Sequence, residues 1–512
     1  MHLKTSLGNL VEVLTGRRWS PRQALCQVAV RADRFGAEAV RAGDRVFLVY
    51  GNRLEFFADL LAVWRLGACA VPIDNRLTAF EVDTLARAAT PSLALVDDNT
   101  NADVVKRLLA LGVRVIHTLD VTAGDGDGDV GLDHADAKRL DDDALILFTS
   151  GSTGDPKGVV HTHRTLGARW TALRQVLGVE DFRRSLCLLP THFGHGLICN
   201  SLFPWLAGQD LYIAVPFRPD LMMQLGKLID EHEVTFLSSV PSMWRLALKM
   251  ARPPQSQTLK RVHCGSAPLS AHLWEQIQGW ASIDHVANVY GITETGSWVA
   301  GISEGGVSPE DGLIGAPWDA TIRIVEGQGS PASPEARIPN KPGESGKVWL
   351  KTAALMKGYF NRDDLTGKVV VGGWFSTGDI GFTDDRGWLY LKGREREEIN
   401  KGGMKIFPAD VDAVIDRFTH TADVCTFAVD DPLHGQNVAA AVVLSEPSDV
   451  TVSQLHAWTK QHLAAYKMPV RWYLRDEIPR TSRGKINRDN VMRLCADLKP
   501  LDIDRIVRNH RE

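Results

Sequence analysis

Short apolar runs alternate with longer segments of helical spacing over the first part of the chain. The run RVFLVY at 45–50 suits a buried strand, and apolar residues over 54–66 recur with the period of a helix. By the same criteria strands are expected at 93–96, 113–116, 145–148, 186–189, 211–215, 235–237 and 286–289, and helices at 219–232, 241–251 and 269–280. Strands that alternate with helices in this way favour parallel sheets covered by helices.

The pattern changes near residue 300. Segments rich in Pro and Gly, such as 330–346, join short strands at 321–325 and 347–351, which is typical of antiparallel structure. The charge-dense segment GREREEINK at 393–401 is interpreted as a linker to a compact α+β unit. In that unit helices are expected at 408–418 and 453–465, and strands at 424–429 and 438–444.

The predicted fold class is therefore α/β with two domains. A large N-terminal domain over 1–395 should contain two parallel-type αβ sheet subdomains and a β subdomain. A small α+β domain over 396–512 should follow it.

Composition adds limits on the partners. The 512 residues are 44% hydrophobic and 23% charged, as in an ordinary globular protein, and the net charge of −4 favours neither nucleic acid nor an anionic membrane. Seven cysteines without a CxxC pair predict free thiols in a reducing compartment. No signal peptide is recognised, and the longest apolar stretch, 56–73, contains Asp59 and Arg65. We therefore expect a cytoplasmic protein that neither spans a membrane nor binds nucleic acid.

The segment LFTSGSTGDPKG at 147–158 has the composition of a phosphate-binding loop. Glycines allow the backbone to approach a ligand closely, hydroxyls and backbone N–H groups can donate to phosphate oxygens, and a lysine adds positive charge. A Walker loop needs Gly before its lysine and Ser or Thr after it, and Pro156 and Gly158 break that template. Composition alone leaves a Gly/Ser loop without a ligand as the alternative. The candidate residues are Thr149, Ser150, Gly151, Ser152, Thr153, Gly154 and Lys157.

Two further motifs suggest metal binding, and both are interpreted otherwise. The run 125–136 resembles a calcium loop, but it has Val130 where Gly is needed and Asp136 where a bidentate Glu is expected, so a solvated surface loop is predicted. His161 and His163 are placed at the start of a helix. No third ligand is apparent near them, which favours packing and helix capping over a metal site.

Six segments occur in a fixed order along the chain. They are the loop at 147–158, YGITE at 290–294, GWFSTGD at 373–379, GR at 393–394, GGMKIFP at 402–408 and PRTSRGK at 479–485. Together they resemble the adenylate-forming superfamily, which includes acyl- and aryl-CoA synthetases, luciferases and the adenylation domains of peptide synthetases. The resemblance implies that a carboxylate attacks the α-phosphorus of ATP, with Mg²⁺ present, and that a thiol, usually of coenzyme A, then displaces AMP. It also implies a small domain that moves between two arrangements.

The resemblance gives roles to individual residues. Lys485 matches the lysine that enters the cleft for adenylation, Thr293 can bond the α-phosphate, and Glu294 matches the carboxylate that holds Mg²⁺. Tyr290 is expected to pack on adenine. The other nucleotide-binding candidates are the ribose-binding pair Asp379 and Arg394, together with Gly265, Ser266, Ala267, Pro268, Asn288, Val289, Gly291 and Ile292.

The motions and the acceptor are assigned in the same way. Gly402 and Gly403 match a glycine pair beside the pantetheine tunnel. Arg396 stands at the hinge, where the family usually has Asp or Lys. The acceptor is expected to be CoA, and a carrier-protein phosphopantetheine thiol is the alternative because it enters by the same tunnel. A monomer or homodimer is expected.

The acid pocket is expected to contain Phe193, His195, Val240 and Trp298. Amino-acid-activating members place an Asp one residue after the aromatic gate, and this chain has Gly194 there, so an amino-acid substrate is disfavoured. The mostly apolar lining suits an aliphatic or aromatic acid. A catalytically inactive nucleotide-binding relative is a third hypothesis, against which the presence of Lys157, Glu294 and Lys485 argues.

Overall fold

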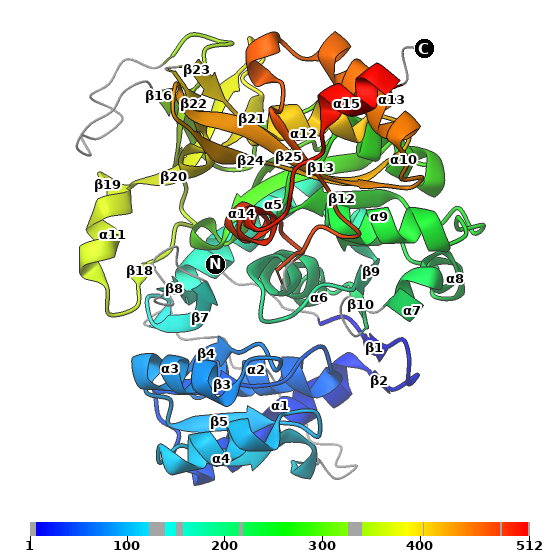
Figure 1. Ribbon diagram of the computed structural model, residues 1–512. Helices are drawn as coiled ribbons and strands as arrows, with labels where there is room; N and C mark the ends of the chain where they lie inside the picture. Colours follow the sequence, from blue (N-terminus) through cyan, green and yellow to red (C-terminus); the bar gives the residue numbers. More distant parts are fainter. Residues whose placement is uncertain are drawn as a thin grey trace.

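The computed structural model describes residues 7–121, 139–149, 157–214, 219–325, 340–402, 404–481 and 484–509. Three sheets organise these residues (Figure 1). The first contains seven strands in the order β18-β8-β7-β4-β3-β5-β6. Its strands and the helices beside it are β3 (Arg45–Leu48), β4 (Cys69–Pro72), β5 (Leu93–Val96), β6 (Arg114–His117), β7 (Asp143–Thr149), β8 (Lys157–Thr162), β18 (Gly358–Tyr359), α1 (Pro21–Ala37), α2 (Leu54–Arg65), α3 (Ala79–Ala89), α4 (Ala102–Ala110) and α5 (His163–Leu177).

Strands β3 to β6 are parallel, as the alternating pattern predicts. Strand β8, in contrast, runs antiparallel to β7, and the two strands pair up to Thr162. The prediction that His161 begins a helix is therefore wrong, because this pairing keeps His161 in the strand. Helix α5 begins at His163, where Thr162 caps it by accepting from the backbone N–H of Thr165 at 3.2 Å.

The second sheet joins a parallel half to an antiparallel half. Its path is β16-β17-β20-β21-β15-β14-β13-β12-β11-β9-β10-β1-β2, with β19 beside β20. The parallel half and its surroundings comprise β1 (Leu10–Glu12), β2 (Arg18–Trp19), β9 (Arg184–Cys187), β10 (Asp210–Ile213), β11 (Phe236–Ser239), β12 (Arg261–Gly265), β13 (Val286–Ile292), a π-helix η4 (His195–Leu202), α6 (Phe203–Leu206), α7 (Pro219–Met223), α8 (Leu225–Glu231), α9 (Pro241–Met250) and α10 (Ala271–Ala281). The helix expected over 219–232 is divided in two at Gln224.

The antiparallel half corresponds to the predicted β subdomain. It comprises β14 (Ser297–Gly301), β15 (Leu313–Pro317), β16 (Thr321–Val325), β17 (Gly346–Lys351), β19 (Val370–Val371), β20 (Trp374–Thr383), β21 (Leu389–Arg394) and α11 (Asp363–Val369). Because β14 pairs with both β13 and β15, this half continues the parallel sheet.

The third sheet forms the small C-terminal unit, drawn yellow to red in Figure 1, with most of it at the top of the view. It comprises β22 (Ile399–Lys401), β23 (Met404–Ile406), β24 (Thr421–Asp431), β25 (Gly435–Leu444) and β26 (Arg471–Leu474), with α12 (Pro408–Asp416), α13 (Asp449–His462), α14 (Arg488–Ala496) and α15 (Ile503–Asn509). This unit has hydrophobic clusters of its own. The boundary at 395/396 stays a prediction.

Two observations bear on the composition argument. The seven cysteines are free thiols, as predicted. No helix within the described ranges combines the length and the apolar character needed to cross a membrane.

Candidate active site

A short turn between β13 and β14, η5 (Thr293–Thr295), places Thr293 and Glu294 at the end of the parallel half of the second sheet. Two buried side chains hold its carbonyl groups. His161 Nε2 lies 2.7 Å from the Thr293 carbonyl oxygen, and Arg169 donates to the Thr295 carbonyl through Nε and Nη2, both at 3.2 Å. Burial lowers the pKa of Arg169 to about 10. The turn is thus fixed by side chains from β8 and α5.

The carboxylate of Glu294 is oriented by a third element. The hydroxyl of Tyr359, in β18, donates to Glu294 Oε1 at 2.8 Å. The ammonium of Lys157 lies 5.7 Å from the centre of the Tyr359 ring. The structure therefore brings two predicted residues, Glu294 and Lys157, beside the same tyrosine.

Sequence reasoning missed His161, Arg169 and Tyr359 as parts of this arrangement. For His161 the sequence favours packing and helix capping over a metal site, and the structure adds two specific partners: its Nδ1 lies 3.3 Å from the Thr165 hydroxyl and its Nε2 faces Thr293. Within the described ranges no group of three or more metal-ligating side chains occurs. A pairing signal that links Tyr359 to Glu294 does not exist in a single sequence, because 65 residues separate them.

The low pKa of His161 predicts acid sensitivity. Burial lowers this pKa from 6.5 to about 4, against the opposing effect of the Thr293 carbonyl. The folded state therefore favours the neutral imidazole of His161. The stability that this preference contributes is fully present above pH 6.5 and is lost as the pH falls from 6.5 towards 4. Between pH 8 and pH 5, protonation of His161 in the unfolded state should lower the free energy of unfolding by about 2 kcal/mol.

Urea unfolding of the parent and of His161→Gln at pH 8 and pH 5 checks this value. The variant should lose about 2 kcal/mol less over that interval, since glutamine does not titrate. His462→Gln, at an exposed position, serves as the control. It should show the same loss of unfolding free energy between pH 8 and pH 5 as the parent. An equal loss in the parent and in His161→Gln would contradict the prediction.

Tyr290, Asp379 and Arg394 form a second connected group. The Tyr290 hydroxyl donates to Asp379 Oδ2, and Arg394 Nε lies 2.7 Å from Asp379 Oδ1. Arg394 also donates to the Thr377 carbonyl at 3.0 Å. Burial raises the pKa of Asp379, while Arg394, Tyr290 and Lys485 oppose the rise. The predicted adenine and ribose residues therefore lie in contact across β13, β20 and β21.

Lys485 reaches this site from the small unit. A tight turn brings Gly484, at φ +74°, before it, and the Thr481 backbone N–H donates to the Lys485 carbonyl at 2.7 Å. Arg480 anchors the turn by donating to both oxygens of Asp423, at 2.8 and 2.6 Å. The Lys485 charge lowers the pKa of both His195 and Asp379, which belong to the large unit. Its ammonium thus acts between these two groups.

His195 begins the π-helix η4 and is buried among polar and aromatic neighbours. Its Nδ1 lies 2.8 Å from the Ser266 hydroxyl, and its Nε2 lies 2.6 Å from the Ser238 hydroxyl. The ring centre lies 6.0 Å from that of Phe193 and 5.6 Å from that of Trp298. Burial and, second, the Lys485 charge lower the pKa of His195 to about 3. The pocket predicted as mostly apolar therefore contains two serine hydroxyls and a neutral imidazole.

The remaining candidates lie around these groups. Thr149 and Lys157 face each other across β7 and β8, and the Asn288 amide donates to the Leu313 carbonyl at 2.8 Å. At Gly291 a β-carbon would lie 2.0 Å from the Ser297 carbonyl oxygen, so glycine is required by the backbone contact. Six predicted residues lie outside the described residues: Ser150, Gly151, Ser152, Thr153, Gly154 and Gly403.

The others are placed as follows. Gly265 ends β12, and Ala267 and Pro268 follow it. Val289 is buried, Ile292 is half-buried, and Val240 is buried just before α9. Gly402, at φ +59°, donates its N–H to the His434 carbonyl at 2.9 Å. The predicted hinge residue Arg396 is exposed in a short turn between β21 and β22.

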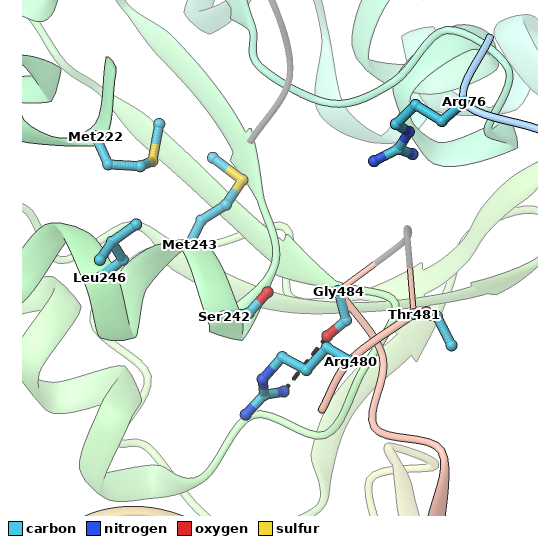
Figure 2. A pocket seen from close by; sticks show the side chains of 8 residues that line it. All are labelled: Arg76, Met222, Ser242, Met243, Leu246, Arg480, Thr481 and Gly484. Atoms are coloured by element: carbon cyan, nitrogen blue, oxygen red, sulfur yellow. Dashed lines mark hydrogen bonds between the residues drawn. The ribbon is translucent and has the colours of Figure 1, made fainter. Parts of the chain in front are cut away.

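A cavity of about 330 Å³ lies between the two units, beside the Lys485 turn (Figure 2). Met222, Met243 and Leu246, from α7 and α9, form its apolar side. Its other lining residues are Arg76, Ser242, Arg480, Thr481 and Gly484. Sequence reasoning did not anticipate this space, because it exists only where the turn meets the large unit.

Ionic and hydrogen-bonding contacts also join the units at α9. Arg245 Nη1 lies 2.7 Å from Asp416 Oδ1, and the Ser270 hydroxyl donates to Asp416 Oδ2 at 2.7 Å. Ser270 also caps α10 by accepting from the Leu273 N–H at 3.2 Å. A further pair joins Arg417 and Asp311 at 2.6 Å. We call Arg245, Ser270 and Asp416 the domain latch.

Known proteins share this sequence and fold. A sequence model of AMP-binding enzymes matches residues 6–360, and a model of the AMP-binding enzyme C-terminal domain matches residues 410–485. An oxalate–CoA ligase of Arabidopsis thaliana is 30% identical over 470 residues, 88% of each chain. A feruloyl-CoA synthase of an Amycolatopsis species is 30% identical over 480 residues, 91% of this chain and 92% of the relative.

A solved structure extends the similarity to three dimensions. The o-succinylbenzoate CoA synthetase of Bacillus subtilis, in complex with its acyl-adenylate intermediate, superposes with a TM-score of 0.79 at 25% identity and covers 95% of each chain. The predicted α/β fold with a large N-terminal and a smaller C-terminal domain is confirmed. The matched family models and the relatives also confirm the resemblance of the chain to the adenylate-forming superfamily. The chain belongs to the family of AMP-binding enzymes, in its acyl- and aryl-CoA synthetase branch.

Proposed function

We infer that this chain is an ATP-dependent acid–CoA ligase. A carboxylate oxygen of the acid attacks the α-phosphorus of ATP, which forms acyl-AMP and releases pyrophosphate. The thiolate of CoA then attacks the acyl carbonyl, which forms the thioester and releases AMP. The observation that supports this most directly is the hydrogen-bonded group of Tyr290, Asp379 and Arg394, on which the charge of Lys485 acts from the small domain.

Each group has a task that its surroundings support. The first step joins an anion to a polyanion, so positive charge placed in advance lowers its barrier. Lys485 supplies that charge where the acid and the α-phosphate meet. Lys157 lies beside the ring of Tyr359 and suits the phosphates that leave as pyrophosphate. His161 and Arg169 fix the turn that contains Thr293. The Thr293 hydroxyl is therefore held in place before the reaction and need not reorganise during it.

The donor set around Glu294 fits Mg²⁺. One carboxylate oxygen is used by Tyr359, and in the described part of the chain the other makes no hydrogen bond. Mg²⁺ is commonly bound through one or two carboxylates together with substrate phosphates. A bound Mg²⁺ would neutralise phosphate charge. Glu294 would hold it, and Tyr359 would keep the carboxylate oriented.

The acceptor is proposed to be CoA, because relatives that match over most of their length are named CoA ligases and synthetases. The carrier-protein thiol remains the alternative that experiment must exclude. The roles of Gly402 and Gly403 beside the acceptor, the hinge role of Arg396, the cytoplasmic location and the monomeric or homodimeric state all stay predictions. Oxalate and ferulate differ widely, so the relatives leave the acid itself open.

Exchange of labelled pyrophosphate into ATP tests the function. With Mg²⁺ and a panel of aliphatic, aryl and dicarboxylic acids, at least one acid should support exchange well above the acid-free rate. With that acid, saturable dependence on free CoA and release of AMP are expected. Acylation of a carrier protein without CoA would favour the alternative acceptor. Absence of exchange with every acid would support an inactive nucleotide-binding relative.

A further inference from the structure

The imidazole of His195 lies between two serine hydroxyl groups that come from the ends of different strands. Ser238 belongs to β11 and Ser266 directly follows β12. Each hydroxyl lies within hydrogen-bonding distance of one ring nitrogen, 2.6 Å for Ser238 and 2.8 Å for Ser266. Strand ends of this kind form the ligand-binding edge of an open α/β sheet.

The hydrogen atoms of this chain of three groups can be assigned. The Ser238 hydroxyl is fully buried, and no other partner for it occurs among the described residues. Since a buried O–H donor left without an acceptor is costly, Ser238 donates to Nε2 of His195. The neutral ring then carries its proton on Nδ1 and donates it to Ser266. The hydroxyl hydrogen of Ser266 is therefore left for another acceptor.

The buried side chain of Trp298 packs against His195, with 5.6 Å between the ring centres. Its ring lies 4.6 Å from that of His263 and 6.0 Å from that of Phe236, and both of these side chains are fully buried. His263 is in turn 5.8 Å from Trp318. Trp298 cannot move back into this packed layer, so it limits how far an acid can extend beyond His195.

The charges near the pocket limit the class of acid further. His195 is neutral, and Lys485 is the cation that acts on it. Because Lys485 serves the reacting carboxylate, a second carboxylate would find no cation of its own among the described hydrogen-bond partners of His195, Ser238 and Ser266. The donor at Ser266 therefore suits an uncharged oxygen.

Resting on the proposed ligase function, we propose that this pocket selects a short aliphatic acid with a hydroxyl or keto oxygen on its chain. Ser266 donates to that oxygen, in place of the nucleotide-binding role that the family resemblance implies for it. Ser238 is a positioning residue that acts through His195, and Trp298 sets the length limit. The reacting carboxylate is left to Lys485 and the Thr293 turn.

Size-matched acids test the oxygen preference. Pyrophosphate release should be measured with 3-hydroxybutyrate against valerate and with 2-oxobutyrate against 2-methylbutyrate. In the parent, kcat/KM should favour one or both oxygen-bearing acids by about tenfold or more. Ser266→Ala should reduce this ratio to nearly one. An equal fall with all four acids would show that Ser266 binds the carboxylate, and would overturn the proposal.

Ser238→Ala separates positioning from packing. Without the Ser238 hydroxyl, His195 can hold its proton on either nitrogen. The variant should therefore reduce the kcat/KM ratio of oxygen-bearing to plain acids, although Ser238 is not expected to touch the acid. The double variant with Ser266→Ala should be no less selective than Ser266→Ala alone. Ser239→Ala is the matched control, since this buried neighbour bonds the His263 carbonyl and Trp244 instead. A ratio unchanged in Ser238→Ala, or lowered equally in Ser239→Ala, would contradict the assignment.

Length is tested separately with Trp298→Leu and the milder Trp298→Phe. Relative to butyrate, kcat/KM for hexanoate and octanoate should rise in at least one of these variants. A parent enzyme that already prefers octanoate would overturn the proposed length limit. These results differ from failure of the proposed function, in which no acid would support pyrophosphate release at all.

Discussion

Lys485→Ala should abolish most acyl-AMP formation and leave the second half-reaction intact. Its ammonium acts on the groups around the first reaction centre, and loss of charge placed where the transition state gains it typically costs on the order of 10²- to 10³-fold in rate. Pyrophosphate exchange measures the first step. Thioester formation from supplied acyl-adenylate and CoA measures the second.

The control for this variant is Lys460→Ala, on the exposed face of α13 in the same domain. It removes the same charge without approaching the site, so both half-reactions should proceed at the parental rate. If both half-reactions fell equally in Lys485→Ala, the use of this lysine in one arrangement only would be wrong for this chain.

Arg245→Asp should displace the small domain from the arrangement that the structure shows. The change places a carboxylate beside Asp416, which is nearly buried in the interface. Since each domain has its own core, the repulsion acts on the contact between the domains more than on folding. Loss of one partner of a buried ion pair costs several kcal/mol, and contacts such as Arg417–Asp311 persist, so a roughly 10- to 100-fold fall in adenylation is expected.

In Arg245→Asp, the rate of thioester formation from supplied acyl-adenylate should stay at the parental value while adenylation falls. The double variant Arg245→Asp with Asp416→Arg restores opposite charges and should recover much of the lost adenylation. Arg252→Asp is the matched control: Arg252 pairs with Asp230 inside the large domain, just beyond α9. An equal loss in Arg252→Asp, or no recovery in the double variant, would exclude the domain latch as the cause.

The elements with strong local patterns could be predicted. The strand expected at 93–96 has the same bounds as β5, and the change to antiparallel structure after residue 300 is confirmed. Strand β8 was missed because its residues, KGVVHT, follow directly on the Gly-rich loop, and pairing with β7 decides their conformation. The division of the helix at Gln224 likewise has no mark in the apolar periodicity.

The sequence names candidate site residues, whereas the contacts between them appear only in the structure. Tyr290 and Asp379 were assigned to separate parts of a nucleotide, and the structure places them in a direct hydrogen bond. His195 was placed in the pocket, whereas the serines that fix its ring come from β11 and from the end of β12. Such contacts join residues that are tens of residues apart, and no local period or motif encodes them.

The aromatic layer behind Trp298 ties substrate choice to the survival of the fold. Replacing a buried tryptophan with alanine commonly costs about 3–5 kcal/mol, which is a large part of the stability of an ordinary domain. A lineage that needed a longer pocket could not simply shorten this side chain; it would first have to gain stability elsewhere. The preference of this enzyme for a particular acid should therefore change slowly in evolution, whereas its surface residues can be substituted more readily.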